Sequence, residues 1–443
     1  MNIQLSDHFT YPRLLRFVLP SIVMMIFTSI YGVVDGLFVS NFVGKTPFAA
    51  VNLIMPFLML FGALGFMLGA GGSAIVAKHL GEGERERAVS VFSMLTCVTV
   101  GCGILLTIVG LFAIRPVAVL LGATGEMLEY CVSYGRIILL AMSAFMLQNL
   151  FQSFLVTAER PQFGLYVTVA AGVTNIVLDF LFIAVFSWGV VGAAAATAIS
   201  QAVGGLVPLV YFLHPKNKSL LRLRKPTFDG HALLHACTNG SSELMTNLSL
   251  SLANMLYNYQ LMRMVGEDGI AAFGVVMYVS FIFITVFIGY SIGSAPIISY
   301  HYGAKNCEEL KGLFRKSLVL MSVFGAAMVT LAVLLAKPFS SFFVGYDEEL
   351  LALTTRGFIL YSLSYLVLGV NIFASSFFTA LGNGGVSAIL SFLRLFVFQV
   401  VTLLVFPIFL GVDGIWSSII GSEILALGMS TYFFLGQRKK YGY

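Results

Sequence analysis

Two aspartates within long apolar stretches are the residues of this chain best suited to hold a small cation. Asp35 follows Tyr-Gly-Val-Val, and Asp179 follows Asn175 by one helical turn. Residues four apart share a face of a helix, so Asn175 and Asp179 point the same way. Thr197 stands in the next apolar stretch. Two carboxylates, an amide and a hydroxyl supply hard oxygen ligands for Na⁺. Two carboxylates in a low dielectric also do not both stay charged easily, so the same group could take up H⁺.

The chain repeats its own pattern at a constant offset of 222 residues, without a gap. The offset joins residues that are identical in the two halves: His79 and His301, Gly81 and Gly303, Pro116 and Pro338, Gly135 and Gly357, Asn149 and Asn371. Two related halves in one membrane chain are typical of transporters in which one half moves against the other.

The repeat also helps to decide whether the two aspartates have only a structural role. Each lies toward the end of its apolar stretch, so a structural role at a helix end is the alternative to cation binding. The second-half equivalents of the four site residues carry no carboxylate: Tyr257, Val397, Val401 and Ile419. Because one half manages without the cluster, we favour a functional role for it in the other half.

A stripe of polar residues begins the second half. Its members recur at intervals of 4, 4, 3 and 4 residues, which is one face of a helix: Glu243, Asn247, Ser251, Asn254 and Asn258. Such a stripe does not face lipid, where its hydrogen-bonding groups would go unpaired. It lines water or packs against another polar helix, and we favour a central cleft. There Glu243 either attracts a cationic substrate or pairs with Arg394.

Further polar residues stand in the fourth and tenth apolar stretches, at related positions of the repeat: Gln148, Asn149, Gln152 and Asn371. They either form facing walls of the same cleft or join helices by hydrogen bonds worth about 0.6 kcal/mol each. The sequence favours neither reading. Arg136 and Arg394 more often act as structural partners of carboxylates than as substrate ligands, and the sequence assigns no role to Glu423.

The composition places the chain in a membrane. Of its 443 residues, 58% are hydrophobic and 10% are charged, whereas soluble domains carry about 25% charged residues. The apolar runs predict twelve spanning helices, six in each half. An even number per half gives both halves the same orientation, so the repeat is parallel. We therefore expect an all-α integral membrane protein with an N-lobe (1–213), a linker (214–235) and a C-lobe (236–443) around a central cleft.

The distribution of lysine and arginine predicts the orientation. With the N-terminus inside, the inward segments hold eighteen of these residues and the outward segments five. We therefore expect a multi-pass protein of the plasma membrane with both termini in the cytoplasm. The first apolar stretch, about 17–42, is too long for a signal-peptide core and is expected to be retained. The net charge of +5 comes from separate short loops, so no nucleic-acid partner is expected.

Motifs of enzymes and of ATP-driven proteins are absent or out of context. Neither GxxxxGK[ST] nor HExxH occurs, so we expect no nucleotide site and no catalytic residue. GxSxG occurs once, at 289–293, inside an apolar stretch and not at a strand-to-helix turn. Five scattered cysteines without CxxC predict no disulfide or metal framework. We expect a monomer without a cofactor, apart from transported Na⁺ or H⁺.

With these features the chain resembles the multidrug and toxic compound extrusion (MATE) family, in particular its bacterial DinF/MepA-like branch. The resemblance covers nearly the whole chain: the twelve spans, the parallel repeat, the first span from Pro20 to Asp35, the glycine-rich second span and the loops at Gly81 and Gly303. It implies two bundles around a V-shaped cleft. It also implies export of amphipathic, often cationic compounds against an inward H⁺ or Na⁺ gradient.

The resemblance also implies where the ion binds. DinF-like members couple to the ion in the N-lobe, through an Asp in the first span, an Asn-x-x-x-Asp in the fifth and a Thr in the sixth, and the matching positions here are Asp35, Asn175, Asp179 and Thr197. NorM-like members use an acidic residue deep in the seventh span and another in the tenth. Here Glu243 lies near the start of the seventh span and the tenth has no carboxylate, so coupling in the C-lobe is not implied.

The sequence thus predicts a cation-coupled antiporter that exports amphipathic, cationic small molecules through the bilayer. A flippase for lipid-linked sugars, on a related architecture, is the nearest alternative. It would need a strongly cationic cleft, for which only Arg136 and Arg394 are candidates. An intramembrane hydrolase with paired aspartates is a further alternative, but it leaves the duplication unexplained.

Overall fold

The computed structural model describes residues 3–217 and 219–443, and the regular structure of these residues is helical. The first half of the described chain forms α1 (Tyr11–Phe38), α2 (Lys45–Gly81), α3 (Arg85–Leu120), α4 (Gly125–Leu140), α5 (Met142–Thr157), α6 (Pro161–Asp179) and α7 (Gly189–Leu213). The second half forms α8 (Gly230–Met264), α9 (Glu267–Gly303), α10 (Cys307–Val344), α11 (Glu348–Ser362), α12 (Tyr365–Ala380), α13 (Gly384–Phe392), α14 (Gln399–Leu410) and α15 (Val412–Tyr441). Short π-helical segments occur at Val39–Val43, Phe180–Val185 and Leu393–Phe398.

These helices make up the twelve spans expected from the sequence. Within the described residues, nine stretches are long and apolar enough to cross a membrane. Two bent pairs, α4 with α5 and α11 with α12, bring the number to eleven. The twelfth is α8, whose 35 residues are long enough to span a bilayer. Its polar stripe, which begins at Glu243, makes it less apolar than the others.

The two halves repeat each other in structure at the offset found in the sequence. Helices α2 and α9 each contain 37 residues, and they begin and end 222 positions apart. The bends recur as well, with 56° between α4 and α5 and 50° between α11 and α12. The expected fold of two parallel six-span repeats is therefore confirmed.

The connection between the halves is shorter than the expected linker. Helix α7 ends at Leu213, as expected, but α8 already begins at Gly230. Asp229 caps α8, because its carboxylate accepts a hydrogen bond of 3.0 Å from the N–H of Ala232. This bond lowers the pKa of the Asp229 carboxyl. An aspartate at this position satisfies a backbone donor that the helix itself leaves unpaired, which explains the earlier start.

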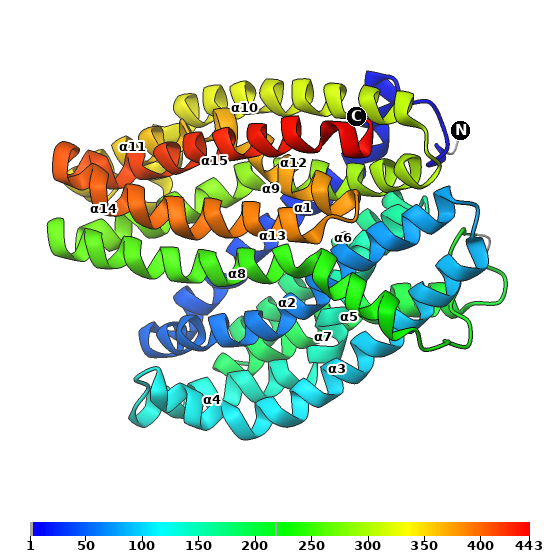
Figure 1. The fold of residues 1–443 in the computed structure, drawn as a ribbon. Coiled ribbons are helices and arrows are strands. Elements are labelled where there is room, and N and C mark those ends of the chain that lie inside the picture. Colours follow the sequence, from blue (N-terminus) through cyan, green and yellow to red (C-terminus); the bar gives the residue numbers. More distant parts are fainter. Residues whose placement is uncertain (1–2, 218) are drawn as a thin grey trace.

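Both ends of the chain lie at one end of the helix bundle, which we call the terminal side (Figure 1). In this view the helices α9 to α15 form the upper part of the molecule and α2 to α7 the lower part, with α8 between them. From here on, the N-lobe comprises α1 to α7 and the C-lobe comprises α8 to α15. The chain returns to the terminal side at the ends of α2 and α9, which are Gly81 and Gly303.

At the terminal side the two lobes touch backbone to backbone. A β-carbon on Gly81 would lie 2.0 Å from the carbonyl oxygen of Tyr300. At the equivalent position, a β-carbon on Gly303 would lie 2.1 Å from the carbonyl oxygen of Lys78. The two contacts are related by the repeat, so a pseudo-two-fold axis passes between α2 and α9. Only glycine permits such an approach, and the lobes are therefore closed against each other here.

The contact continues along the helices but not to their other end. A β-carbon on Gly240 of α8 would lie 1.9 Å from the carbonyl oxygen of Met67 in α2. Farther from the terminal side, β-carbons on Gly32 of α1 and Gly274 of α9 would have open space around them. The interface between the lobes is thus tight near the terminal side and looser toward the opposite side.

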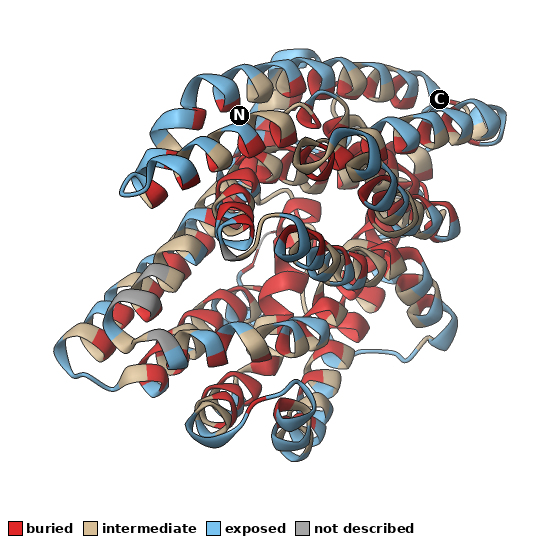
Figure 2. Cartoon of the chain, turned by 90° about the vertical axis from the view of Figure 1, so that its left-hand side faces the viewer, coloured by how far each residue is buried: buried red, intermediate tan, exposed pale blue. Residues whose placement is uncertain are grey.

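Apolar side chains fill the interior of each lobe. One large cluster joins the C-lobe helices around residues such as Trp416 and Phe287, and two smaller clusters fill the N-lobe. Viewed along the helices, buried residues face inward and exposed residues cover the outside (Figure 2). Large apolar side chains such as Phe112, Leu120 and Phe409 are exposed, as expected for surfaces that a bilayer covers.

Candidate cation site

The two aspartates meet inside the N-lobe because α1 and α6 pack closely. Gly172 of α6 makes this possible, since a β-carbon there would lie 2.5 Å from the ring of Phe27 in α1. The close packing brings the carboxyl group of Asp35 next to that of Asp179. The sequence predicted from residue types that Asp35 and Asp179 lie close together, and the packing of α1 against α6 brings them together.

Asn175 and Thr197 are the other two members of the group that the sequence proposes. Asn175 lies one turn before Asp179 on α6, and Thr197 lies on α7. Asn175 is 2% exposed and Asp179 is 0% exposed. Thr197 and Asp35 are half-buried. Two helices and the first span therefore deliver all four side chains to one place in the lobe interior.

Among the described residues, this group has oxygen atoms without hydrogen-bond partners. They are Oδ1 of Asp35, Oδ1 of Asn175, both carboxylate oxygens of Asp179 and Oγ1 of Thr197. Buried polar groups are nearly always paired, and an unpaired carboxylate in an apolar interior is costly. Five unpaired oxygen atoms in one place are chemically suited to Na⁺, or to a proton shared between the carboxylates.

Both aspartates lie where an α-helix passes into a π-helical segment. Helix α6 ends at Asp179 and continues as Phe180–Val185, and α1 ends three residues after Asp35 and continues as Val39–Val43. A π-helical turn interrupts the regular backbone hydrogen bonding and is frequent at functional sites. Nothing in the apolar pattern of the sequence marks these turns.

Three tyrosines that sequence reasoning missed surround the carboxylates. Tyr134 of α4 is 1% exposed, lies near both carboxylates and faces the hydroxyl of Thr197. Tyr31 lies one turn before Asp35 on α1, and Tyr278 approaches Asp35 from α9 in the other lobe. Single tyrosines in apolar helices do not stand out in a chain with eighteen of them. Only the packing of α4 against α7 and of α1 against α9 places Tyr134 and Tyr278 here.

Three residues predicted to line the cleft lie inside the N-lobe instead of on an open wall. Gln148, Asn149 and Gln152 of α5 are 6%, 4% and 9% exposed. With Thr168 and Gly204, the two glutamines line a cavity of about 10 Å³, which is room for about one water molecule. Within the described structure, Oε1 of Gln148 and Nδ2 of Asn149 have no hydrogen-bond partner. These side chains extend the polar interior of the N-lobe beyond the cation site.

The polar stripe of α8 stays partly accessible. Glu243, Asn247, Ser251 and Asn258 are half-buried, and Asn254 is exposed. The side chains of Asn247 and Ser251 donate to carbonyl groups one turn earlier, at 2.8 and 3.0 Å. The stripe therefore faces neither a packed core nor a polar helix that would satisfy it. A wall of a water-filled cleft remains our interpretation of it.

Arg394 pairs with Glu423 and not with Glu243, so one of the two alternatives left open for Glu243 is wrong. Its Nε donates at 2.8 Å to Glu423 of α15, whose carboxylate is fully buried. Asn371 donates to the same carboxylate at 2.7 Å and accepts a bond of 3.0 Å from Ser430. A buried carboxylate requires a cation and hydrogen-bond donors, and Arg394 meets that need inside the C-lobe. Asn371 is likewise occupied there, and we leave it out of the proposed cleft.

A cavity of about 240 Å³ lies between the lobes beside α1. Its walls are apolar and rich in aromatic rings, and they include Val33, Gly36, Phe48, Tyr278 and Phe343. Because Tyr278 also approaches Asp35, the cavity adjoins the cation site. Such walls suit a flat, apolar ligand.

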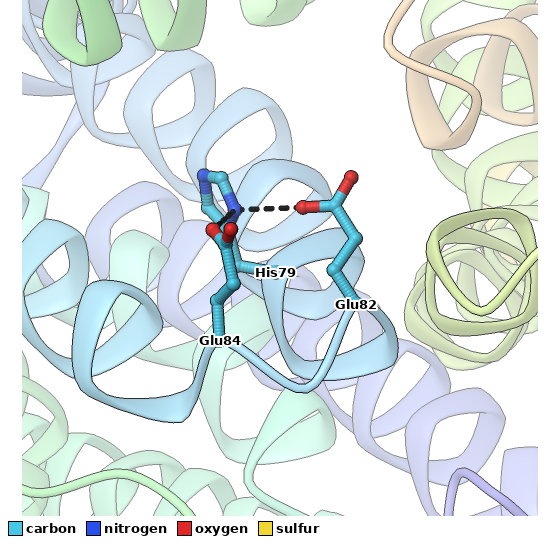
Figure 3. A group of neighbouring side chains, drawn as sticks. All are labelled: His79, Glu82 and Glu84. Carbon is cyan, nitrogen blue, oxygen red and sulfur yellow. Dashed lines mark hydrogen bonds and ion pairs between the residues drawn. The ribbon is translucent and has the colours of Figure 1, made fainter.

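A second group of metal-binding residue types lies at the terminal end of α2 (Figure 3). Nδ1 of His79 is 3.0 Å from a carboxylate oxygen of Glu82 and 3.2 Å from one of Glu84. Both glutamates are exposed, and Lys78 lies 3.7 Å from Glu82. These side chains already satisfy one another at a helix end, and exposed acidic groups of this kind are common, so we do not interpret them as a metal site.

Comparison with known proteins agrees with the fold and the repeat. The family model described as MatE matches the chain twice, over residues 20–181 and 244–405. The multidrug export protein MepA of Staphylococcus saprophyticus is 23% identical over 428 residues, covering 96% of this chain and 94% of that protein. MepA of Staphylococcus haemolyticus is 24% identical, covering 97% and 94%.

A solved structure is also similar over nearly the full length. It is described as the outward-facing conformation of a multidrug resistance MATE family transporter of the MOP superfamily, with a TM-score of 0.92 and 25% sequence identity. The match covers 99% of this chain and 98% of that one. The similarity extends over both lobes, so it includes the arrangement of one lobe against the other.

Proposed function

This chain belongs to the MATE family of multi-span membrane transporters, and we propose that it is a secondary antiporter that exports amphipathic, cationic small molecules in exchange for inward H⁺ or Na⁺. The observation that carries the proposal is the group of Asp35, Asn175, Asp179 and Thr197 in the lobe interior, five of whose side-chain oxygen atoms lack hydrogen-bond partners among the described residues. A transported cation would satisfy these atoms and offset the cost of burying them.

Charge sets the proposed orientation. Of the eighteen lysines and arginines of the inward segments, the seventeen within the described residues stand near the helix ends of the terminal side, which we therefore assign to the cytoplasm. The lobes are closed against each other on this side through Gly81 and Gly303. In the proposed orientation this arrangement faces outward, and the similarity to an outward-facing relative supports it.

The proposed coupling is an exchange of ligands between two lobe arrangements. The cation binds beside Asp35, and the apolar cavity that holds Tyr278 adjoins the same residue. If cation and substrate favour different arrangements, each promotes release of the other, because binding equilibria are reciprocally linked. The membrane potential adds about 2.3 kcal/mol per 100 mV for each net charge moved inward.

The charges of the described residues argue against the flippase alternative, and an experiment separates the hydrolase alternative. A flippase for lipid-linked pyrophosphates would need free cationic groups in the cleft, and Arg394 is bound to Glu423 within the C-lobe, while Arg136 is exposed on α4. An intramembrane hydrolase would use paired aspartates for catalysis. Chain-length analysis of a co-reconstituted peptide library by mass spectrometry would detect cleavage, and we expect none.

Efflux from proteoliposomes under separately imposed pH and Na⁺ gradients tests the proposal. The wild-type protein should expel a fluorescent organic cation in response to one of the two gradients. Asp179→Asn should lose this response, since it removes one of the two carboxylates. Asp268→Asn is a matched control, because Asp268 is an exposed carboxylate at the start of α9, and it should transport normally. Undiminished efflux by Asp179→Asn would refute the role of the site.

A further inference from the structure

Residues 3–9, which precede α1 and which we call the N-terminal segment, connect the two lobes across the terminal side. Leu5 and Phe9 are both 0% exposed and pack in the apolar cluster of the C-lobe, although α1 belongs to the N-lobe. The ring of Phe9 meets that of His301 in α9 edge to face, with centroids 6.3 Å apart. The segment is therefore a packed part of the structure and not a loose end.

Polar contacts tie the segment to the C-lobe through one carboxylate. Glu309, in the first turn of α10, is buried and accepts a hydrogen bond of 2.9 Å from the backbone N–H of Phe9. Its other oxygen lies 2.6 Å from Nδ1 of His8. The ammonium group of Lys316, two turns farther along α10, donates to the carbonyl oxygen of Phe9. The C-lobe thus binds the N-terminal segment through the side chain of His8 and through the backbone N–H and carbonyl groups of Phe9.

A second carboxylate ties the same segment to the N-lobe. The backbone N–H of Leu5 donates to Oε1 of Glu159 at 2.6 Å. Glu159 lies in the turn between α5 and α6, on the terminal side. Its backbone has φ of 60°, which is unfavourable for a residue with a side chain. The corresponding turn after α12 has the same pattern of backbone hydrogen bonds and places Gly382, with φ of 75°, at this position.

The two anchors lie on lobes that must separate when the terminal side opens. Glu159 belongs to the N-lobe and Glu309 to the C-lobe, and the segment bonds to both while the lobes are in contact. A segment of seven residues packed against both carboxylates cannot follow both as the lobes move apart. It must leave at least one anchor in the arrangement that is open on the terminal side.

We propose that the N-terminal segment is a releasable latch that stabilises the arrangement closed on the terminal side, held by Glu159 on one lobe and Glu309 on the other. Its link to transport rests on the proposed function, in which the terminal side opens once per cycle. The latch proposal by itself concerns only the relative populations of the two lobe arrangements. It predicts that loss of either anchor raises the population open on the terminal side.

The segment that precedes α8 offers a built-in comparison. Its backbone lies along α3 of the N-lobe, where Arg224 binds Glu86 at 2.7 Å and its N–H donates to Ser93 at 3.0 Å. This segment joins α7 to α8 in one chain, so it stays connected to both lobes in every arrangement. Of these two segments, only the N-terminal one must lose contacts when the terminal side opens.

Distance measurements between spin labels test the latch without transport. Labels on cysteines at Glu82 and Ala304, exposed equivalent positions at the ends of α2 and α9, report the opening of the terminal side by double electron–electron resonance. The five native cysteines are replaced, and the protein is measured in nanodiscs without substrate. Losing one charge-assisted hydrogen bond should raise the ratio of open to closed molecules by about tenfold.

Two anchor variants and one control decide the outcome. Glu309→Ala removes the C-lobe anchor, and Glu159→Gly removes the N-lobe anchor while suiting the backbone of its turn. Glu308→Ala is the control, because Glu308 is exposed in the same first turn of α10 as Glu309, and it should leave the distances unchanged. Unchanged distances in both anchor variants, with folding confirmed by an unaltered unfolding temperature, would overturn the latch.

Hydrogen exchange of residues 3–9 provides a second measurement that does not depend on the labels. The amides of Leu5 and Phe9 should exchange faster in the anchor variants than in the Glu308→Ala control. Exchange rates that match the control in both variants would also overturn the latch. If the latch responds as expected but Asp179→Asn still transports, only the proposed coupling site has failed.

Discussion

Asp35 and Tyr257 occupy equivalent positions in the two halves of the chain, yet their polar surroundings are opposite in kind. The hydroxyl of Tyr257 is hydrogen-bonded to Ser418 at 2.7 Å and accepts a bond from the side-chain amide of Gln399. Oδ1 of Asp35 has no partner within the described structure. The C-lobe has thus closed this position with neutral groups that satisfy one another, whereas the N-lobe presents carboxylates without partners.

The first prediction concerns the stability of the N-lobe carboxylates. Asp179→Asn should unfold at the same temperature as the wild-type protein or a higher one when the coupling ion is withheld, because it removes a costly buried charge. A saturating coupling ion should stabilise the wild type by about 2.7 kcal/mol at a hundredfold excess over its dissociation constant. The variant should gain nothing. Thermal unfolding in detergent, with Na⁺ replaced by choline and at two pH values, measures both effects.

The experiment has a clear negative result. A variant stabilised by Na⁺ or by lower pH as much as the wild type would show that the ion binds elsewhere. Asp268→Asn should retain the full stabilisation of the wild type, since its carboxylate is exposed at the start of α9.

The second prediction concerns the buried ion pair of the C-lobe. Glu423→Ala should lower the free energy of unfolding by about 3–5 kcal/mol, because it leaves Arg394, whose side chain is only 12% exposed, without a counter-charge. The double variant Arg394→Met/Glu423→Met should recover much of that loss. Asp413→Ala removes the partner of Arg356 in a pair that is largely exposed, and it should cost far less. Equal losses for Glu423→Ala and Asp413→Ala, measured by denaturant unfolding, would contradict this account.

The fold was accessible from the sequence because apolar run length and a gapless repeat are both local, countable signals. The four residues proposed as a cation site were chosen from the sequence by their types and by the spacing of Asn175 and Asp179, and their role in cation binding stays a prediction. The partner of Arg394 was not predictable. Glu243 and Glu423 were both acidic residues within spans, and only the packing of the C-lobe helices determines which of them the guanidinium reaches.

The sequence also did not predict the contacts that depend on how closely two backbone segments approach each other. Tyr134 gains its place beside the carboxylates from the fold of α4, and no spacing in the chain reveals it. The role of residues 3–9 was missed for the same reason. Their contacts with Glu159 and Glu309 join positions more than 150 residues apart, and short polar segments before a first span look alike whether they are packed or free.

The third prediction concerns closure of the terminal side by glycine. Gly303→Ala places a methyl group 2.1 Å from the carbonyl oxygen of Lys78, so the lobes cannot close fully. Overpacking of this kind costs about 1–3 kcal/mol, and the spin-label distance across the terminal side should lengthen. Gly81→Ala should act alike, because the repeat places it against Tyr300.

Gly101→Ala is the control for this prediction. A β-carbon on Gly101 in α3 meets nothing within 4 Å, and an alanine in a helix stabilises by about 0.5–1 kcal/mol relative to glycine. The control should keep the closed distance and unfold slightly later. Normal closure in Gly303→Ala would mean that the lobe contact is not what closes this side.

The last prediction is a pH dependence of the latch at its N-lobe anchor. Burial raises the pKa of the Glu159 carboxyl, and Asp7 adds to the rise, while the N–H of Leu5 and the charge of Arg160 oppose it. A raised pKa in the latched state means that latching is favoured below the usual value of about 4.3 and weakens as pH rises through the raised value. Hydrogen exchange of Leu5, corrected for its intrinsic pH dependence, should show that loss of protection in the wild type.

Glu159→Gln should remove this pH dependence, because its amide oxygen still accepts from Leu5 but does not titrate. The contacts of His8 and Glu309 at the other anchor are the same in both proteins and therefore cancel in the difference between them. The two exchange profiles should diverge as pH rises above about 4.3 and run parallel at neutral pH. Profiles that stay parallel throughout would show that the Glu159 carboxylate does not hold the segment. The glycine of the corresponding turn would then be the better residue for this position, and Glu159→Gly should stabilise the protein without loosening it.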